Sequence, residues 1–99
     1  MADRAIQISV DTTTGDFTYA PTHVRAKPGD TITFSCPTGP FAVMFKHTAP
    51  GKHVHLHAAG GASSQTGADS LGVHQYAAAI FAAGRVYVDG GCGDVGVGD

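Results

Sequence analysis

Short stretches in which every second residue is apolar recur along this chain, and they constrain its fold more than any other feature. In the first stretch, Ile6, Ile8 and Val10 alternate with polar residues. This period of two is typical of a β-strand that buries one face. No long stretch shows the apolar spacing of a buried helix, so the sequence predicts an all-β protein.

Turn signals separate these stretches. The segment Lys27-Pro28-Gly29-Asp30 predicts a tight turn, because proline presets its own φ and glycine accepts the positive φ of a type II turn. The strands expected next, Thr31–Ser35 and Phe41–Phe45, are rich in β-branched and aromatic residues. The side chains predicted to face the core here are Ile32, Phe34, Phe41, Val43 and Phe45.

The hydrophobic pattern weakens in the middle of the chain and returns towards its end. His53–His57 alternates strictly and predicts a short strand, whereas the glycine-rich and serine-rich segment Gly60–Gly67 predicts a flexible loop. Further strands are expected at His74–Phe81, Val86–Val88 and Val95–Val97. About seven to eight strands in 99 residues favour a single β-sandwich domain spanning residues 1–99.

Composition excludes several classes of function. Only 14% of the residues are charged and the formal net charge is −2, which is a poor basis for binding nucleic acid. No apolar run reaches the ~20 residues of a membrane span, and we expect no membrane insertion. The first residues do not show the pattern of a secretion signal. No nucleophile elbow surrounds Ser63-Ser64, and we therefore expect that the protein is not an enzyme.

The segment Phe17–Phe45 resembles the N-terminal half of cupredoxins such as plastocyanin-like and azurin-like domains. The resemblance rests on Phe17-x-Tyr19-x-Pro21, on the run Lys27–Phe34 and on the run Gly39–Phe45. It implies a Greek-key β-sandwich. Cupredoxins are commonly exported, so the resemblance also implies a periplasmic or extracellular location.

The same resemblance exposes two departures from a type 1 copper site. Phe41 stands where the family places its first histidine ligand. The family's other ligands are a cysteine, a histidine and a methionine in one loop, but Cys92 is followed by neither histidine nor methionine. We therefore expect a non-catalytic module with a degenerate copper site. It would act as a structural or protein-interaction domain and self-associate through strand edges. Blue-copper electron transfer is a third function, which only the analogy of fold implies.

Histidines form the sharpest cluster of chemically active residues. On a strand, His53, His55 and His57 share one face at intervals of about 6.6 Å, so two of them can converge on one metal ion. The third ligand would come from His47, His74 or Asp69, and imidazole favours Cu, Zn or Ni. The simpler interpretation is that these histidines are only the polar residues of a half-exposed strand, in keeping with a structural module. The alternative function is that of a metal-binding or metal-carrying protein that uses His53, His55 and His57.

The two cysteines also leave two alternatives open. If the cupredoxin topology holds, Cys36 and Cys92 lie near the same end of the sandwich and are candidates for a disulfide. Otherwise they are two buried thiols. They lack the Cys-x-x-Cys spacing that lowers the pKa of a thiol.

Overall fold

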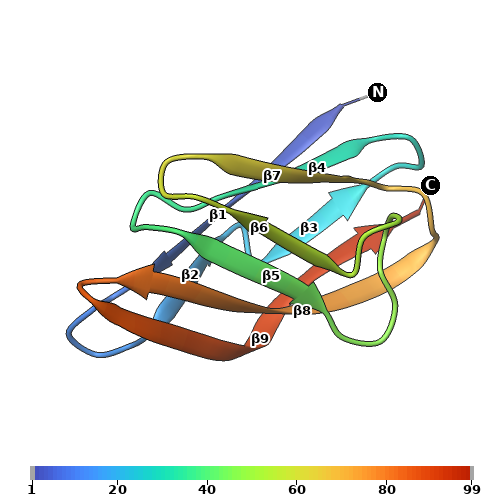
Figure 1. Cartoon of the computed structure of the whole chain (residues 1–99). Coiled ribbons are helices and arrows are strands. Elements are labelled where there is room, and N and C mark those ends of the chain that lie inside the picture. Colours follow the sequence, from blue (N-terminus) through green and yellow to red (C-terminus); the bar gives the residue numbers. More distant parts are fainter. Residues whose placement is uncertain (1, 99) are drawn as a thin grey trace.

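Two β-sheets face each other in the computed structural model, which describes residues 2–98 apart from the side chain of Cys92 (Figure 1). The first sheet has the strand order β2 (Phe17–Ala20), β1 (Asp3–Val10), β4 (Thr31–Ser35) and β7 (Ser63–Gly67). The second has the order β3 (His23–Ala26), β9 (Arg85–Val97), β8 (Gly72–Ala82), β5 (Phe41–Phe45) and β6 (His55–Ala58). The predicted all-β sandwich is confirmed, with nine strands within the described range.

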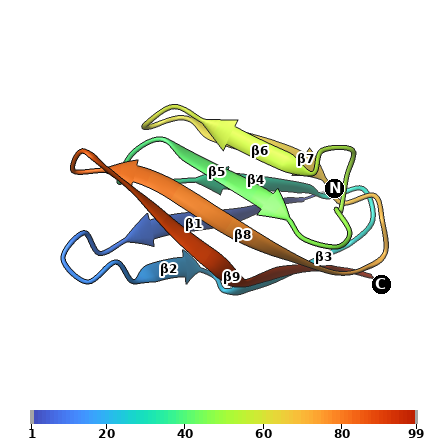
Figure 2. The same ribbon diagram turned by 60° about the horizontal axis from the view of Figure 1, so that its bottom comes forward.

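The chain passes repeatedly from one sheet to the other. It crosses between β2 and β3, between β3 and β4, between β4 and β5, and on either side of β7. β1 pairs in parallel with β4, and β3 pairs in parallel with β9, whereas the remaining pairs are antiparallel. Neither sheet is therefore made from one continuous part of the chain, and the two layers can be traced in both views (Figure 2).

The core lies between the sheets and is centred on Tyr76. The ring of Tyr76 packs edge-on against Tyr19, Phe34 and Phe45, with centroid distances of 5.5, 5.2 and 6.0 Å. Such edge-to-face pairs add to the stabilisation that burial of the rings provides. The five side chains predicted to face the core are all buried.

Tyr76 also explains why the C-terminal strand passes through a glycine cluster. The sequence predicted two short strands on either side of Gly90, Gly91 and Gly93, and this is wrong, because β9 runs without a break from Arg85 to Val97. A Cβ atom on Gly93 would overlap the phenol ring of Tyr76, and one on Gly91 would overlap the carbonyl oxygen of Tyr76. Glycine is therefore required for β9 to lie against β8 at this point.

The loop predicted at Gly60–Gly67 is also corrected. Its second half forms β7, an edge strand that pairs with β4 from Ser63 to Gly67. This strand is polar and only Thr66 is buried, so it lacks the apolar alternation by which the other strands were found. Within residues 2–98 there is no helix with the length and apolarity that a membrane span requires.

Candidate functional site

The end of the sandwich near Phe41 is closed by apolar side chains. Phe41 is 4% exposed and lies opposite Ile80 in the pairing of β5 with β8. The backbone N–H of Phe81 donates to the carbonyl oxygen of Pro40 at 2.9 Å, which holds the loop after β4 against the end of β8. A buried benzyl side chain thus occupies the position where the cupredoxin resemblance would require an imidazole.

The two cysteines lie on different elements. Cys36 is a free, buried thiol directly after β4, and it lines a small surface hollow with Pro37 and Gly61. Cys92 belongs to β9, next to Gly93, which pairs with Tyr76 in the middle of β8; its side chain lies outside the description. Cys36 is free in this structure, so the candidate disulfide between Cys36 and Cys92 is not seen, and the side chain of Cys92 lies outside the described part of the chain.

His74 is a structural residue. It is 2% exposed, its Nδ1 lies 2.7 Å from the hydroxyl of Thr48, and its Nε2 lies 2.8 Å from the carbonyl oxygen of Ser70. Because a carbonyl can only accept, Nε2–H donates to Ser70, and in the neutral ring Nδ1 accepts from Thr48. Both ring nitrogens are therefore engaged in joining β8 to the loops that flank it.

The other histidines divide into separate groups. His47 lies in the turn after β5, and His53 precedes β6 and lines a hollow with Lys52 and Asp69. His55 and His57 are exposed on β6, on either side of buried Leu56. Among the described residues, no three histidine, cysteine, aspartate or glutamate side chains come together as a metal site. Metal binding by these histidines stays a prediction.

Met44 was missed by the sequence reasoning and lies beside the histidine pair. It is 45% exposed on β5, directly opposite His55, and Ala42 lies opposite His57. A hollow of about 370 Å³ on the outer face of the second sheet is lined by Met44, His55 and His57. Its other lining residues are Ala42, Ala77, Ala78, Ala79, Val43, Leu56 and Val88. Only the strand register reveals this neighbour, because Met44 and His55 are far apart in sequence.

An apolar patch lies on the same outer face, near the β8–β9 turn. We define the outer patch as Phe81, Val86 and Val88, which are 49%, 67% and 73% exposed. Phe81 pairs with Val86 across the hairpin, and Ala79 pairs with Val88, so these side chains are neighbours. Apolar groups that gather on a surface in this way mark interaction sites.

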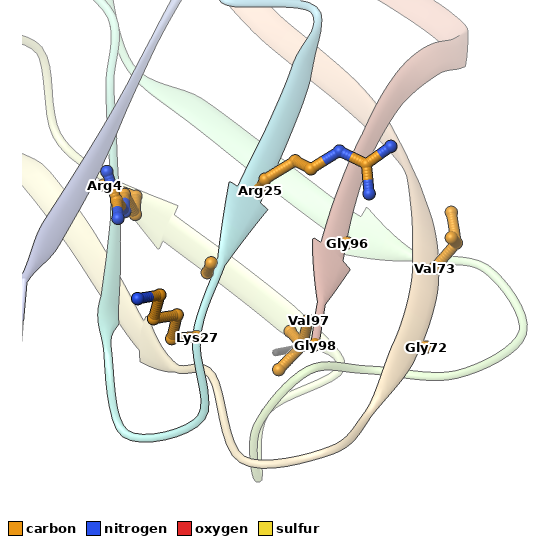
Figure 3. A pocket seen from close by; sticks show the side chains of 9 residues that line it. Arg4, Arg25, Lys27, Gly72, Val73, Gly96, Val97 and Gly98 are labelled. Atoms are coloured by element: carbon orange, nitrogen blue, oxygen red, sulfur yellow. The ribbon is translucent and has the colours of Figure 1, made fainter.

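A basic hollow of about 360 Å³ lies at the opposite end of β9 (Figure 3). Arg4, Arg25 and Lys27 line it together with three glycines, and they are three of the six lysines and arginines of the chain. Arg4 is partly neutralised, because its Nε lies 3.4 Å from Oδ2 of Asp30. Arg25 and Lys27 are exposed, so this is a charged surface feature without the buried polar groups of a built anion site.

Asp30 closes the turn beside this hollow. Its carboxylate accepts from the backbone N–H groups of Ala2 and Lys27, each at 2.9 Å, and faces Arg4. The backbone hydrogen bonds, followed by the interactions with Arg4, hold the pKa of Asp30 below its usual value and outweigh the opposing effect of burial. Asp30 therefore joins the start of β1 to the β3–β4 turn.

Cupredoxins are among the solved structures with a similar fold. A purple cupredoxin from Nitrosopumilus maritimus has a TM-score of 0.65 at 22% identity, with 97% of this chain and 100% of that chain covered. A pseudoazurin from Sinorhizobium meliloti has a TM-score of 0.66 at 20% identity, covering 100% of this chain and 76% of that one. For a pseudoazurin from Methylobacterium extorquens the TM-score is 0.59 at 27% identity, with coverage of 98% and 76%.

No protein-family model and no curated protein sequence matches the chain. The similar structures nevertheless confirm the fold expected from the resemblance: the chain has a cupredoxin-like fold. Amicyanin structures match as well, at 17% to 19% identity.

Proposed function

We propose that this cupredoxin-like domain is a non-catalytic interaction module whose contact surface is the outer patch, and that the patch binds a second copy of the chain. The observation that carries the proposal is the exposure of Phe81, Val86 and Val88 on neighbouring positions of one sheet face. Removing these side chains from water is favourable at about 25 cal/mol per Å² of apolar surface.

The absence of charge within the patch favours a second copy as the partner. A twofold axis through the patch places each residue against an equivalent surface. Because all three side chains are uncharged, this arrangement neither brings like charges together nor buries an unpaired charge. A partner selected by charge would find no complementary group in the patch itself.

Strand edges, which the sequence predicts as the sites of self-association, support the proposal less well. The edge strands are β2 and β7 in the first sheet and β3 and β6 in the second. β2, β3 and β6 have four residues each and β7 has five, and short edge strands are a common protection against edge-to-edge pairing. We therefore assign association to the sheet face.

Sedimentation velocity at increasing protein concentration tests the proposal. The wild-type chain is expected to shift from monomer to dimer, and Val86→Asp and Val88→Asp are expected to remain monomeric. Val73→Asp is the matched control, because Val73 is also 67% exposed on the outer face of β8 but lies at the opposite end of the strand. A wild-type chain that stays monomeric, or patch variants that dimerise as strongly as the control, would contradict it.

Three further expectations belong to this proposal and remain predictions. The buried Phe41 supports a domain that does not carry electrons through a type 1 copper centre, although the similar structures are cupredoxins. Ser63 and Ser64 lie in edge strand β7 and not at the strand-to-helix turn of a nucleophile elbow, which supports the expectation of a non-catalytic domain. A periplasmic or extracellular location is what the resemblance implies.

A further inference from the structure

The hollow between β5 and β6 combines two imidazoles with a thioether. His55 and His57 are two residues apart on β6 and both are exposed, which places their Cα atoms about 6.6 Å apart on one face. Met44 is the residue directly opposite His55, and directly opposed side chains on one face have Cβ atoms about 4.5–5.5 Å apart. All three side chains line the same hollow.

Small neighbours leave room for these three side chains to converge. Across β5 and β8, Met44 pairs with Ala77 and Ala42 pairs with Ala79. The alanine methyl groups form the floor of the hollow and are too short to fill it. Long, flexible Met44 can therefore turn its sulfur towards the imidazoles without displacing a neighbour, since its side chain has three rotatable bonds.

The chemistry of the lining selects a soft metal ion. No lysine, arginine, aspartate or glutamate lines the hollow among the residues that the structure describes. Hard cations such as Mg²⁺ and Ca²⁺ require oxygen ligands, which this lining does not offer. Thioether and imidazole are ligands that suit monovalent copper, a soft ion that accepts a low coordination number.

We propose that Met44, His55 and His57 form a surface site for Cu(I) on the outer face of the second sheet. The site is separate from the apolar end around Phe41. Its hollow shares Val88 with the outer patch, so Cu(I) binding is measured at a protein concentration at which the chain is monomeric, which keeps its outcome distinct from that of the dimerisation test. It differs from the site expected from the sequence, because Met44 takes the place of His53, which lies in another hollow with Lys52 and Asp69.

Competition for Cu(I) with a chromophoric chelator under anaerobic conditions tests the site. One equivalent is expected to bind to the wild-type chain. Met44→Leu keeps the apolar volume and removes the sulfur, and is expected to weaken Cu(I) binding at least about tenfold. His55→Gln and His57→Gln are expected to weaken it further, whereas His53→Gln, the matched control, is expected to bind as the wild type does.

A second measurement reports on the sulfur directly. The chain has only two methionines, so the ε-methyl resonance of Met44 can be identified by its loss in Met44→Leu. Adding Ag(I), a redox-inert substitute for Cu(I), is expected to shift this resonance. Because Met44 and the histidines are exposed, the variants are expected to keep the wild-type thermal midpoint, which excludes unfolding as the cause.

The proposal is overturned if Met44→Leu binds Cu(I) as tightly as the wild type and Ag(I) leaves the Met44 methyl resonance in place. It is also overturned if His53→Gln removes binding, because the metal would then lie at the other hollow. Zn²⁺ provides the contrast: any Zn²⁺ bound by the histidine pair should be unaffected by Met44→Leu, since zinc takes nitrogen in preference to a thioether.

Discussion

At the scale of single residues, Asp30 links stability to pH. Its backbone and arginine partners lower its pKa in the folded protein relative to the usual value of 3.8. A carboxyl group whose pKa falls on folding stabilises the protein above its unfolded pKa, and this contribution is lost as the pH falls towards the folded pKa. The stabilisation by Asp30 is therefore fully present at neutral pH and is lost progressively as the pH falls below about 4, towards the lower pKa of the folded state.

Asp30→Asn is accordingly expected to lower the urea midpoint at pH 7 and to have a smaller effect at pH 3. The substitution keeps the shape of the side chain but removes the charge that attracts Arg4 and the two backbone N–H groups. Urea unfolding of both proteins at the two pH values measures the difference. Asp16→Asn, in the β1–β2 turn, is the control, and an equal loss of stability at both pH values would show that the charge of Asp30 is not the cause.

At the scale of elements, the turn between β8 and β9 contains a residue in an unfavourable conformation. Ala83 has φ of 51° and Gly84 has φ of 72°, the positive values that a two-residue type I′ hairpin requires at both central positions. Glycine accepts this conformation freely, but alanine does not, and asparagine tolerates it best among residues with a side chain.

Ala83→Asn is expected to raise the free energy of unfolding by about 0.5–1 kcal/mol, part of the cost of about 1–2 kcal/mol that a left-handed residue carries. Chemical denaturation measures the change. Ala83→Val is the opposite control and is expected to destabilise, because a β-branched residue fits this conformation worst. If the two substitutions have the same effect, the turn does not have this geometry in solution.

The strands that could be predicted from sequence are those with a contrast between their two faces. β1, β4 and β5 each place a large apolar residue at every second, buried position, and all three lie where they are expected. β7 has no such contrast, and β9 was divided in two because glycines were taken as a turn. The reason for those glycines is the ring of Tyr76 on the neighbouring strand, which no local pattern contains.

The candidate metal residues show the same limit. Sequence spacing could place His55 and His57 on one face, but it also grouped His53 with them, although β6 begins only at His55. Met44 could not be chosen, because its proximity to His55 depends on the register of β5 with β6. The buried role of His74 depends on Thr48 and Ser70, which reach it from two different loops.

At the scale of the whole molecule, a cupredoxin-like fold without its usual imidazole ligand should not produce a blue protein. Addition of Cu(II) to the purified chain is expected to give no intense thiolate band near ~600 nm. The expectation rests on Phe41, which the resemblance places at the first ligand position and which is buried, and on Cys92, which lies within strand β9. Absorption spectroscopy checks this, and a blue band that is lost in Cys92→Ser would contradict it.

Both described ends of the polypeptide meet at the turn between β3 and β4. The backbone N–H of Thr31 donates to Ala2 and that of Gly98 donates to Ala26, while the outer patch lies at the far end of the β8–β9 hairpin (Figure 2). A tag, tether or fused protein added at either terminus would extend away from Phe81, Val86 and Val88. Immobilising the chain through either end would therefore present the patch to solution in one orientation, unobstructed by the attachment.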